Sequence, residues 1–324
     1  MLAMGTIFAD VMVWRDHSWR MMQWAKAILH TEKVAKHETI VETPWSKVLK
    51  FTTSNPERQF FLKQTPKDLF LEAAIIKTLR DTCNITAIPE IIAENKSLSC
   101  FLMPQCGDFS LRDYFAGSLQ LDVFINGLQT YKTIQKSTVD HVDKFLDLGV
   151  PDWRLNKFPL LYQELLIIDK RLYRYATKFT ELCEELASYK IPACLNHSDF
   201  HDNNILYNKK DHHTTIIDFG ETAITHPFFS MAAGLQSTVD HYNISVDSDS
   251  YQELQRVCFS GWLDADSDAE LQDVLQLVNK LLPIYLVLTD MRLMNDVGAD
   301  AGALDSMSKI KNKVERNLIY WKMV

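Results

Sequence analysis

Residues 197–204 have the sequence HSDFHDNN, and residues 216–220 have the sequence IIDFG. In this order they supply a carboxylate at Asp199, a carboxamide at Asn204 and a second carboxylate at Asp218. A carboxylate at the first position can orient an attacking hydroxyl and accept its proton, and the other two groups offer the hard oxygen ligands that Mg²⁺ prefers. The pattern therefore predicts a metal-dependent phosphoryl-transfer site, with Asp199 as the catalytic residue and Asn204 and Asp218 as metal ligands.

These two segments resemble the catalytic and metal-binding motifs of the aminoglycoside phosphotransferase and choline kinase family. The resemblance implies ATP as donor, Mg²⁺ as cofactor and a hydroxylated small molecule as acceptor. It also implies an α+β, protein-kinase-like bilobal fold. We expect residues 1–106 to form a small nucleotide-binding lobe with an antiparallel sheet, and residues 107–324 to form a larger, mainly helical lobe for catalysis and substrate binding.

Composition agrees with a globular enzyme of two lobes. The chain has 324 residues, of which 47% are hydrophobic and 23% charged, and its net charge of −8 disfavours a nucleic-acid partner. The six cysteines contain no C-x-x-C pair, which favours reduced thiols in the cytoplasm. The N-terminus lacks the features of a signal peptide, and the apolar stretch at 281–288 is too short to span a bilayer. We therefore expect a cytoplasmic protein with no membrane partner; nothing indicates its oligomeric state.

The first third has the pattern of a nucleotide lobe. A helix at 19–30 precedes an expected antiparallel meander and a second helix, with strands at 38–42, 47–53 and 58–64 and the helix at 67–82. In kinase-like lobes the third strand supplies a lysine for the phosphates, and the next helix supplies a glutamate that holds it. Lys63 and Glu72 occupy these positions. The alternative is that both are ordinary solvated side chains.

Two further nucleotide contacts follow from the resemblance. Ser46 and its backbone N–H would contact a phosphate from the turn at 42–46, although a plain hairpin turn explains these residues equally well. No glycine occurs between Gly5 and Gly107, so this turn lacks the residue that best allows close approach to phosphate. After a strand at 99–103, the carbonyl of Pro104 and the N–H of Cys106 would meet the adenine edge.

The rest of the chain has helical periodicity around the catalytic segment. Helices are expected at 111–115, 121–148 and 160–189, and two short strands at 205–207 and 214–217 would place both metal ligands at strand ends. We expect Asp152 and Arg154 to staple a loop, and His197 and His201 to be structural. Asp202 and Asn203 are expected to cap or solvate the catalytic loop. By resemblance, Ser230 stands where an aspartate is common, so support for the catalytic loop would be weakened. The resemblance also implies that Glu221 either assists the metal site or contacts substrate.

Several alternatives stay open at this point. Acidic residues between 240 and 268 would help to bind a polyamine by resemblance, or form a solvated loop. Protein kinase activity is disfavoured because no H-R-D-L or A-P-E motif is present and a long activation loop has no room. A metal-dependent hydrolase would not explain Lys63 and Glu72. A catalytically silent nucleotide-binding module remains the competing function, and only the glycine-free turn favours it. The acceptor itself is not identified by any motif.

Overall fold

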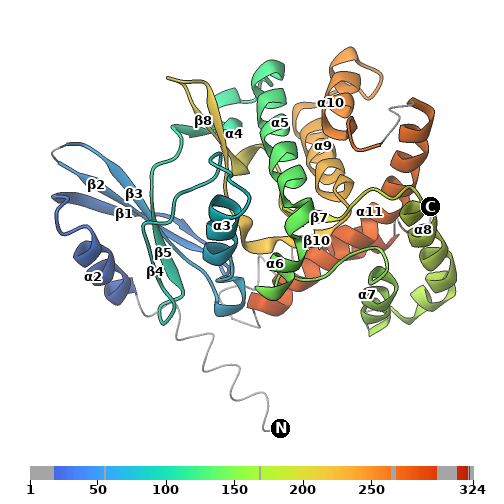
Figure 1. Cartoon of the computed structure of the whole chain (residues 1–324), viewed down its shortest axis with the longest axis horizontal. Coiled ribbons are helices and arrows are strands. Elements are labelled where there is room, and N and C mark those ends of the chain that lie inside the picture. The colour runs from blue at the N-terminus through green and yellow to red at the C-terminus, as the bar shows by residue number, and fades with distance from the viewer. Residues whose placement is uncertain are drawn as a thin grey trace, which may run out of the picture.

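The computed structural model describes residues 18–54, 56–167, 169–263, 268–297, 312–319 and 321. A sheet-containing lobe and a larger helical lobe lie side by side, with the sheet and α2 at one end of the molecule (Figure 1). The first lobe has a five-stranded antiparallel sheet of order β1-β2-β3-β5-β4. Its elements are α2 (Ser18–Ile28), β1 (Val34–Glu42), β2 (Lys47–Thr53), β3 (Gln59–Gln64), α3 (Glu72–Asp81), β4 (Ala93–Asn95) and β5 (Cys100–Pro104).

Strand alternation in β3 separates a structural face of this sheet from a functional one. Helix α2 covers one face, where Met21 and Ala25 pack with Phe60 and Leu62 in a small apolar core. Because successive side chains of a strand point to opposite faces, Lys63 points to the other face, toward α3. The sequence of β3 therefore aims one buried lysine at the helix that carries Glu72.

The second lobe is mainly helical, as predicted. Its helices are α4 (Leu111–Phe115), α5 (Leu121–Thr138), α6 (Val142–Asp147), α7 (Phe158–Glu164), α8 (Ala176–Ser188), α9 (Phe228–Tyr242), α10 (Asp249–Phe259) and α11 (Asp268–Val297). Residues 312–319 add a further helix.

Two small antiparallel sheets hold the catalytic segment. One has the order β6-β8-β9, and the other pairs β10 with β7. The strands are β6 (Phe109–Ser110), β7 (Cys194–Asn196), β8 (Ile205–Asn208), β9 (His213–Ile216) and β10 (Ala223–Thr225). Asn204 immediately precedes β8, and Asp218 follows two residues after β9, so the two predicted metal ligands lie at strand ends.

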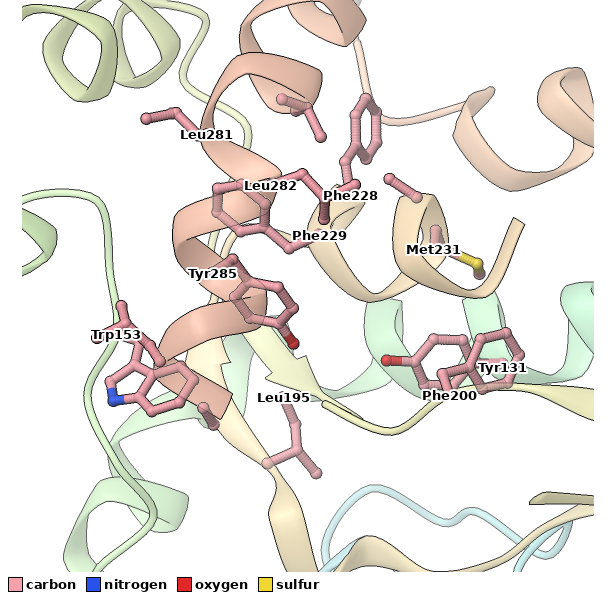
Figure 2. Close-up of a cluster of buried hydrophobic side chains, with 14 of the residues drawn as sticks. Tyr131, Trp153, Leu195, Phe200, Phe228, Phe229, Met231, Leu281, Leu282 and Tyr285 are labelled. Atoms are coloured by element: carbon pink, nitrogen blue, oxygen red, sulfur yellow. The ribbon is translucent and has the colours of Figure 1, made fainter. Parts of the chain in front are cut away.

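Aromatic side chains fill the core beneath the catalytic segment. Phe229 of α9 stacks on Tyr285 of α11, with ring centroids 5.0 Å apart, and Leu282 lies beside them (Figure 2). Tyr131 of α5 stacks on Phe200 of the catalytic loop at 4.0 Å (Figure 2). The stacking of Phe200 on Tyr131 fixes the catalytic loop against α5.

Helix α11 is the only helix in the described part of the chain that is long and apolar enough to cross a membrane by length and composition. In the structure, 67% of its apolar window is buried inside the protein, where it packs against α8 and α9. The apolar side chains of α11 therefore form part of the core of the helical lobe.

Most predicted elements occur, with some corrections. The helix expected at 67–82 is a 3₁₀ turn at Lys67–Leu69 followed by α3, and the segment at 121–148 is divided between α5 and α6 by a second 3₁₀ turn. Strands β4, β6, β7 and β10 were not predicted, because two or three residues are too few to show periodicity.

The predicted boundary after Cys106 stays a prediction, and the chain is tightly packed there. A Cβ atom on Gly107 would lie 2.5 Å from the Cβ of Leu206 in β8. The Thr215 hydroxyl of β9 also donates to the Cys106 carbonyl at 3.0 Å. The segment between the lobes therefore needs glycine for its close approach to the catalytic strands.

Candidate active site

A buried lysine connects the two lobes. The Nζ of Lys63 lies 2.7 Å from Oε2 of Glu72 and 2.5 Å from Oδ1 of Asp218. The lysine and glutamate side chains are 7% and 2% exposed, whereas the Asp218 side chain is 43% exposed. The backbone N–H of Phe219 also donates to Oε1 of Glu72 at 3.2 Å. Lys63 and Glu72 are therefore a paired, buried unit and not the solvated residues of the alternative interpretation.

Burial and charge act in opposite directions on this group. Burial alone lowers the pKa of Lys63, but Asp218 and Glu72 outweigh it and raise that pKa above its ordinary value. Burial raises the pKa of Glu72 to about 7, although Lys63 opposes the shift. The lysine is consequently a permanent cation at the nucleotide side of the cleft.

The Asp218 position is held by its backbone. Asp218 has φ 69° and ψ 59°, in the left-handed region that aspartate tolerates better than most residues. One residue earlier, the Ile217 carbonyl accepts from Nε2 of His197 at 2.8 Å, and the Ile217 N–H donates to the Asn204 carbonyl at 3.0 Å. The predicted structural role of His197 is thus visible as a bond that ties both metal-ligand segments together.

Asp199 and Asn204 share direct hydrogen bonds. The Nδ2 of Asn204 donates to the Asp199 carbonyl at 2.8 Å and to its Oδ2 at 3.2 Å. The Nδ1 of His201 accepts from the Asn203 N–H, and its Nε2 lies 3.4 Å from the same Oδ2. Burial alone would raise the pKa of Asp199, but His201, His197 and Lys313 lower it below its ordinary value. Asp199 is therefore an ionised carboxylate, half exposed to the cleft.

Ser230 stands at the position where the family often has an aspartate, and it takes part in a chain of hydrogen bonds between neutral side chains behind the catalytic loop. The His197 N–H donates to the Tyr131 hydroxyl at 2.8 Å, and that hydroxyl bonds Oγ of Ser230 at 2.7 Å. Ser230 in turn donates to Oδ1 of Asn196 at 2.5 Å, and Gln135 adds a bond at 3.3 Å. Ser230 thus belongs to a fully buried network that joins α5, β7 and α9, while weaker support of the loop through the missing aspartate stays a prediction.

Asp202 is an anchor of the loop. It is 2% exposed, and its Oδ1 accepts from Nε and Nη2 of Arg112 at 3.0 and 2.6 Å. The Tyr242 hydroxyl donates to its Oδ2 at 2.5 Å. The expectation that Asp202 caps or solvates the loop is corrected in this respect, because it ties the loop to α4 and α9. Nothing in the local sequence signals this, since Arg112 is 90 residues away.

The Asp152–Arg154 staple is present as predicted. Nε and Nη2 of Arg154 donate to the two carboxylate oxygens of Asp152 at 2.8 and 2.6 Å. The following Trp153 N–H donates to the Ile224 carbonyl of β10 at 2.8 Å. The staple is thus structural and supports the small sheet beside the catalytic loop.

The glycine-free turn between β1 and β2 folds inward. The Ser46 N–H donates to Oγ1 of Thr43 at 3.0 Å, and Ser46 is 7% exposed. Its N–H is therefore engaged within the turn, and a phosphate contact by Ser46 stays a prediction. The neighbouring Trp45 packs against the core of the helical lobe. The turn thus makes a contact between the lobes that the sequence did not reveal.

The backbone after β5 is compatible with the predicted adenine contacts. The Gln105 N–H donates to the Gln59 carbonyl at 2.9 Å, so Phe60 and Pro104 form a pair without ladder hydrogen bonds. The Pro104 carbonyl consequently points away from β3. Contacts of Pro104 and Cys106 with a nucleotide base stay predictions.

A cavity of about 860 Å³ opens beside Asp199. The charged and aromatic side chains that line it include Trp45, Asp199, His201, Glu221, Asp240, Asp290, Lys313 and Arg316. Burial raises the pKa of Glu221 to about 8, helped by Asp199 and Asp218, and raises that of Asp290 to about 6 against the effect of Lys313. The cavity has the size and mixed chemistry of a small-molecule site. Of the predicted acidic group, Asp240 reaches this cavity, whereas Asp264 and Asp266 lie outside the described residues.

The oxygen donors fit a hard divalent cation. Asn204 and Asp218 are joined through the Ile217–Asn204 bond, and 43% of the Asp218 side chain is exposed. Mg²⁺ is commonly bound by one or two protein oxygens, with phosphate and water completing its shell. Within the described residues no cluster of three or more His, Cys, Asp or Glu side chains forms a separate metal cage.

Comparisons with known proteins agree with this geometry. The family model described as "Phosphotransferase enzyme family" matches residues 131–243. Among solved structures, the ethanolamine kinase of Plasmodium vivax is 13% identical, with a TM-score of 0.64 and coverage of 88% of this chain and 82% of the other. The GDP and kanamycin complex of APH(2")-IIia is 15% identical, with a TM-score of 0.58 and coverage of 91% and 98%. A type I macrolide 2'-phosphotransferase is 11% identical, with a TM-score of 0.57 and coverage of 89% and 96%.

A comparison with curated protein sequences gives no match. The protein-kinase-like α+β fold is confirmed by the architecture and by the solved structures. The resemblance to the aminoglycoside phosphotransferase and choline kinase family is confirmed over residues 131–243 by the family model, whose matched residues contain both catalytic motifs. The solved structures, each at most 15% identical, agree with it in fold.

Proposed function

We propose that this protein is an ATP- and Mg²⁺-dependent phosphotransferase that moves the γ-phosphate to a hydroxyl of a small molecule. The observation that carries the proposal is the connection of Lys63, Glu72 and Asp218 across the lobes, next to an ionised Asp199 that lines an 860 Å³ cavity. Proteins of the same fold include an ethanolamine kinase, a macrolide phosphotransferase and a phosphotransferase whose structure holds GDP and kanamycin. Their ligands guide the choice of acceptors for testing.

Each residue has a defined task in this proposal. Lys63, held by Glu72, binds the α- and β-phosphates, and the backbone around Pro104 and Cys106 binds the base. Asn204 and Asp218 would hold Mg²⁺, which supplies charge neutralisation on the phosphates when bound. Asp199 orients the acceptor hydroxyl and takes its proton as the oxygen attacks. A low pKa suits this task, because the loose transition state demands positioning more than basicity.

The silent binding module is the competing function. It would need the fold and the nucleotide contacts but not Asp199 or the cavity beside it. The transferase is supported by the contacts among the five polar groups of the proposed site, since Lys63 bonds Glu72 and Asp218, and Asn204 bonds Asp199. The inward-folded turn carrying Ser46 is the one feature that favours the competitor.

The two functions are separated by product analysis. The protein is incubated with ATP, Mg²⁺ and separate acceptors, including ethanolamine, kanamycin and a macrolide, and ³¹P NMR is used to detect a phosphate ester. The proposal predicts an ester with at least one hydroxylated acceptor, and none with the Asp199→Ala variant. Nucleotide binding without any ester across a broad panel of alcohols would support the silent module instead.

A further inference from the structure

The cavity beside Asp199 continues into a second one. A groove of about 470 Å³ lies between α9, α10, α11 and the helix at 312–319. Five residues line both spaces: Gln236, Asp240, Leu286, Arg316 and Asn317. The two spaces therefore adjoin, with the charged side chains of Asp240 and Arg316 at their boundary.

The groove is lined by more apolar than polar side chains, the polar ones being Gln236, Asp240, Gln255, Asn279, Arg316 and Asn317. Its buried side chains are Ala232, Leu235, Phe259, Leu275 and Leu282, each at most 7% exposed. Val246, which is 57% exposed, lies at its rim. By contrast, the cavity at the other end holds the ionisable groups of Asp199, Glu221, Asp290 and Lys313. The joined space therefore changes from polar to apolar with distance from the catalytic carboxylate.

A single helix connects the two ends. Leu275 and Leu282 of α11 line the groove, Leu286 lines both spaces, and Asp290 lines the polar cavity. At about 1.5 Å per residue, the 15 steps from Leu275 to Asp290 cover about 22 Å. This length is too great for a compact acceptor such as ethanolamine, and suits a molecule with an extended apolar part.

We propose that the acceptor is an amphipathic alcohol, with its hydroxyl-bearing head at Asp199 and an aliphatic tail in the groove formed by α9, α10 and α11. The inference rests on the proposed function for the chemistry at the head, while the tail site rests on the groove alone. Continuity with the catalytic cavity favours the substrate's own tail as the occupant over a separate protein partner. Apolar walls would take up the tail because its transfer from water is favourable.

A homologous series of alcohols tests the groove directly. Ethanol, 1-butanol, 1-hexanol and 1-octanol are titrated into the full chain by calorimetry, without nucleotide. Burial of each methylene is expected to strengthen binding about fourfold. Phosphorylation of the same alcohols with ATP and Mg²⁺ is then followed by ³¹P NMR, and kcat/KM is expected to rise with chain length.

Two variants and one control locate the tail. Val246→Asp places a charge at the rim, and Ala232→Phe fills the groove, so both should lose the dependence on chain length. Ile167→Asp is the control, because Ile167 is 87% exposed and lies outside the groove. Circular dichroism checks that each variant is folded, and Val246→Asp still tests the site if the buried Ala232→Phe is not.

The outcomes separate the two proposals. Binding that strengthens with chain length in the wild type and in Ile167→Asp, but not in the groove variants, supports the tail site. Equal affinity for all four alcohols, the same dependence in Val246→Asp, or a kcat/KM that ignores chain length would overturn it. A normal binding series without transfer to any alcohol would count against the proposed phosphotransferase and leave the groove assignment standing.

Discussion

The nucleotide side and the acceptor side of the cleft use the same kinds of charged residue in different ways. On the nucleotide side, Lys63 lies within 2.7 Å of both Glu72 and Asp218. On the acceptor side, Glu221, Asp290 and Lys313 line one cavity, yet among the described residues no ion pair joins any two of them. Groups that are paired before any ligand arrives are preorganised for one task. Groups that are not paired with one another can instead bind the polar atoms of a ligand.

The largest expected effect is at the point where the two sides meet. Replacing Asp199 by alanine should lower kcat by about 10²–10⁴-fold, the usual contribution of a positioned general base. Binding of ATP should be almost unchanged, because Asp199 lies outside the Lys63–Glu72–Asp218 group. Steady-state turnover and calorimetric nucleotide binding measure the two effects. Near-normal turnover in Asp199→Ala would remove it from the catalytic role.

Substitutions of Lys63 and Glu72 should have coupled effects on stability, because the two side chains form a buried ion pair. Lys63→Met leaves the buried Glu72 carboxylate without its cation, so both stability and nucleotide affinity should fall. A loss of about 10–100-fold in ATP affinity is expected from removing a charge-assisted contact. The double variant Lys63→Met/Glu72→Gln should regain part of the stability but none of the affinity. A double-variant cycle in urea unfolding measures this, and strict additivity would contradict the coupling.

The neutral network behind the catalytic loop should affect stability more than chemistry. Ser230→Ala removes the hydroxyl that Tyr131 and Asn196 share, so the buried Tyr131 O–H loses its acceptor and Oδ1 of Asn196 loses its shortest hydrogen bond. The free energy of unfolding should fall by about 1–3 kcal/mol. Thr238→Val is the matched control on α9, because the Thr238 hydroxyl bonds only the Gly234 carbonyl within its own helix. Equal losses in both variants would mean that the network adds nothing.

The smallest effects are expected on the acceptor side. Asp290→Asn should change the acceptor KM by up to about fivefold and leave the ATP KM unaltered, because a single partly solvated charge contributes about 1 kcal/mol or less. Asp273→Asn, at an exposed position of the same helix outside the cavity, is the control. A change in ATP KM with no change in acceptor KM would reverse the assignment of the two sides.

The sequence predicted the pairing of Lys63 with Glu72 and the position of Asp218 at a strand end, because these features are encoded locally. HSDFHDNN and IIDFG hold three functional groups within 20 residues, and alternation along β3 directs Lys63 toward α3. The acceptor side depends on residues that only the tertiary fold brings together. Trp45, Asp290 and Lys313 come from three distant segments, and no spacing rule relates them. The same reason explains the missed partner of Asp202 and the missed network around Ser230.

The central claim is that Asp218 holds a metal for a nucleotide bound between the lobes. The most direct measurement is the thermal stabilisation of the protein by ATP, with and without Mg²⁺, in the wild type, in Asp218→Ala and in the exposed control Asp143→Ala. At about 100 times Kd, bound nucleotide adds about 2.7 kcal/mol, which corresponds to a rise of several degrees in Tm. The account predicts that Mg²⁺ enlarges this rise in the wild type and in the control but not in Asp218→Ala. No rise in any of the three proteins, or the same Mg²⁺ dependence in all of them, would contradict it.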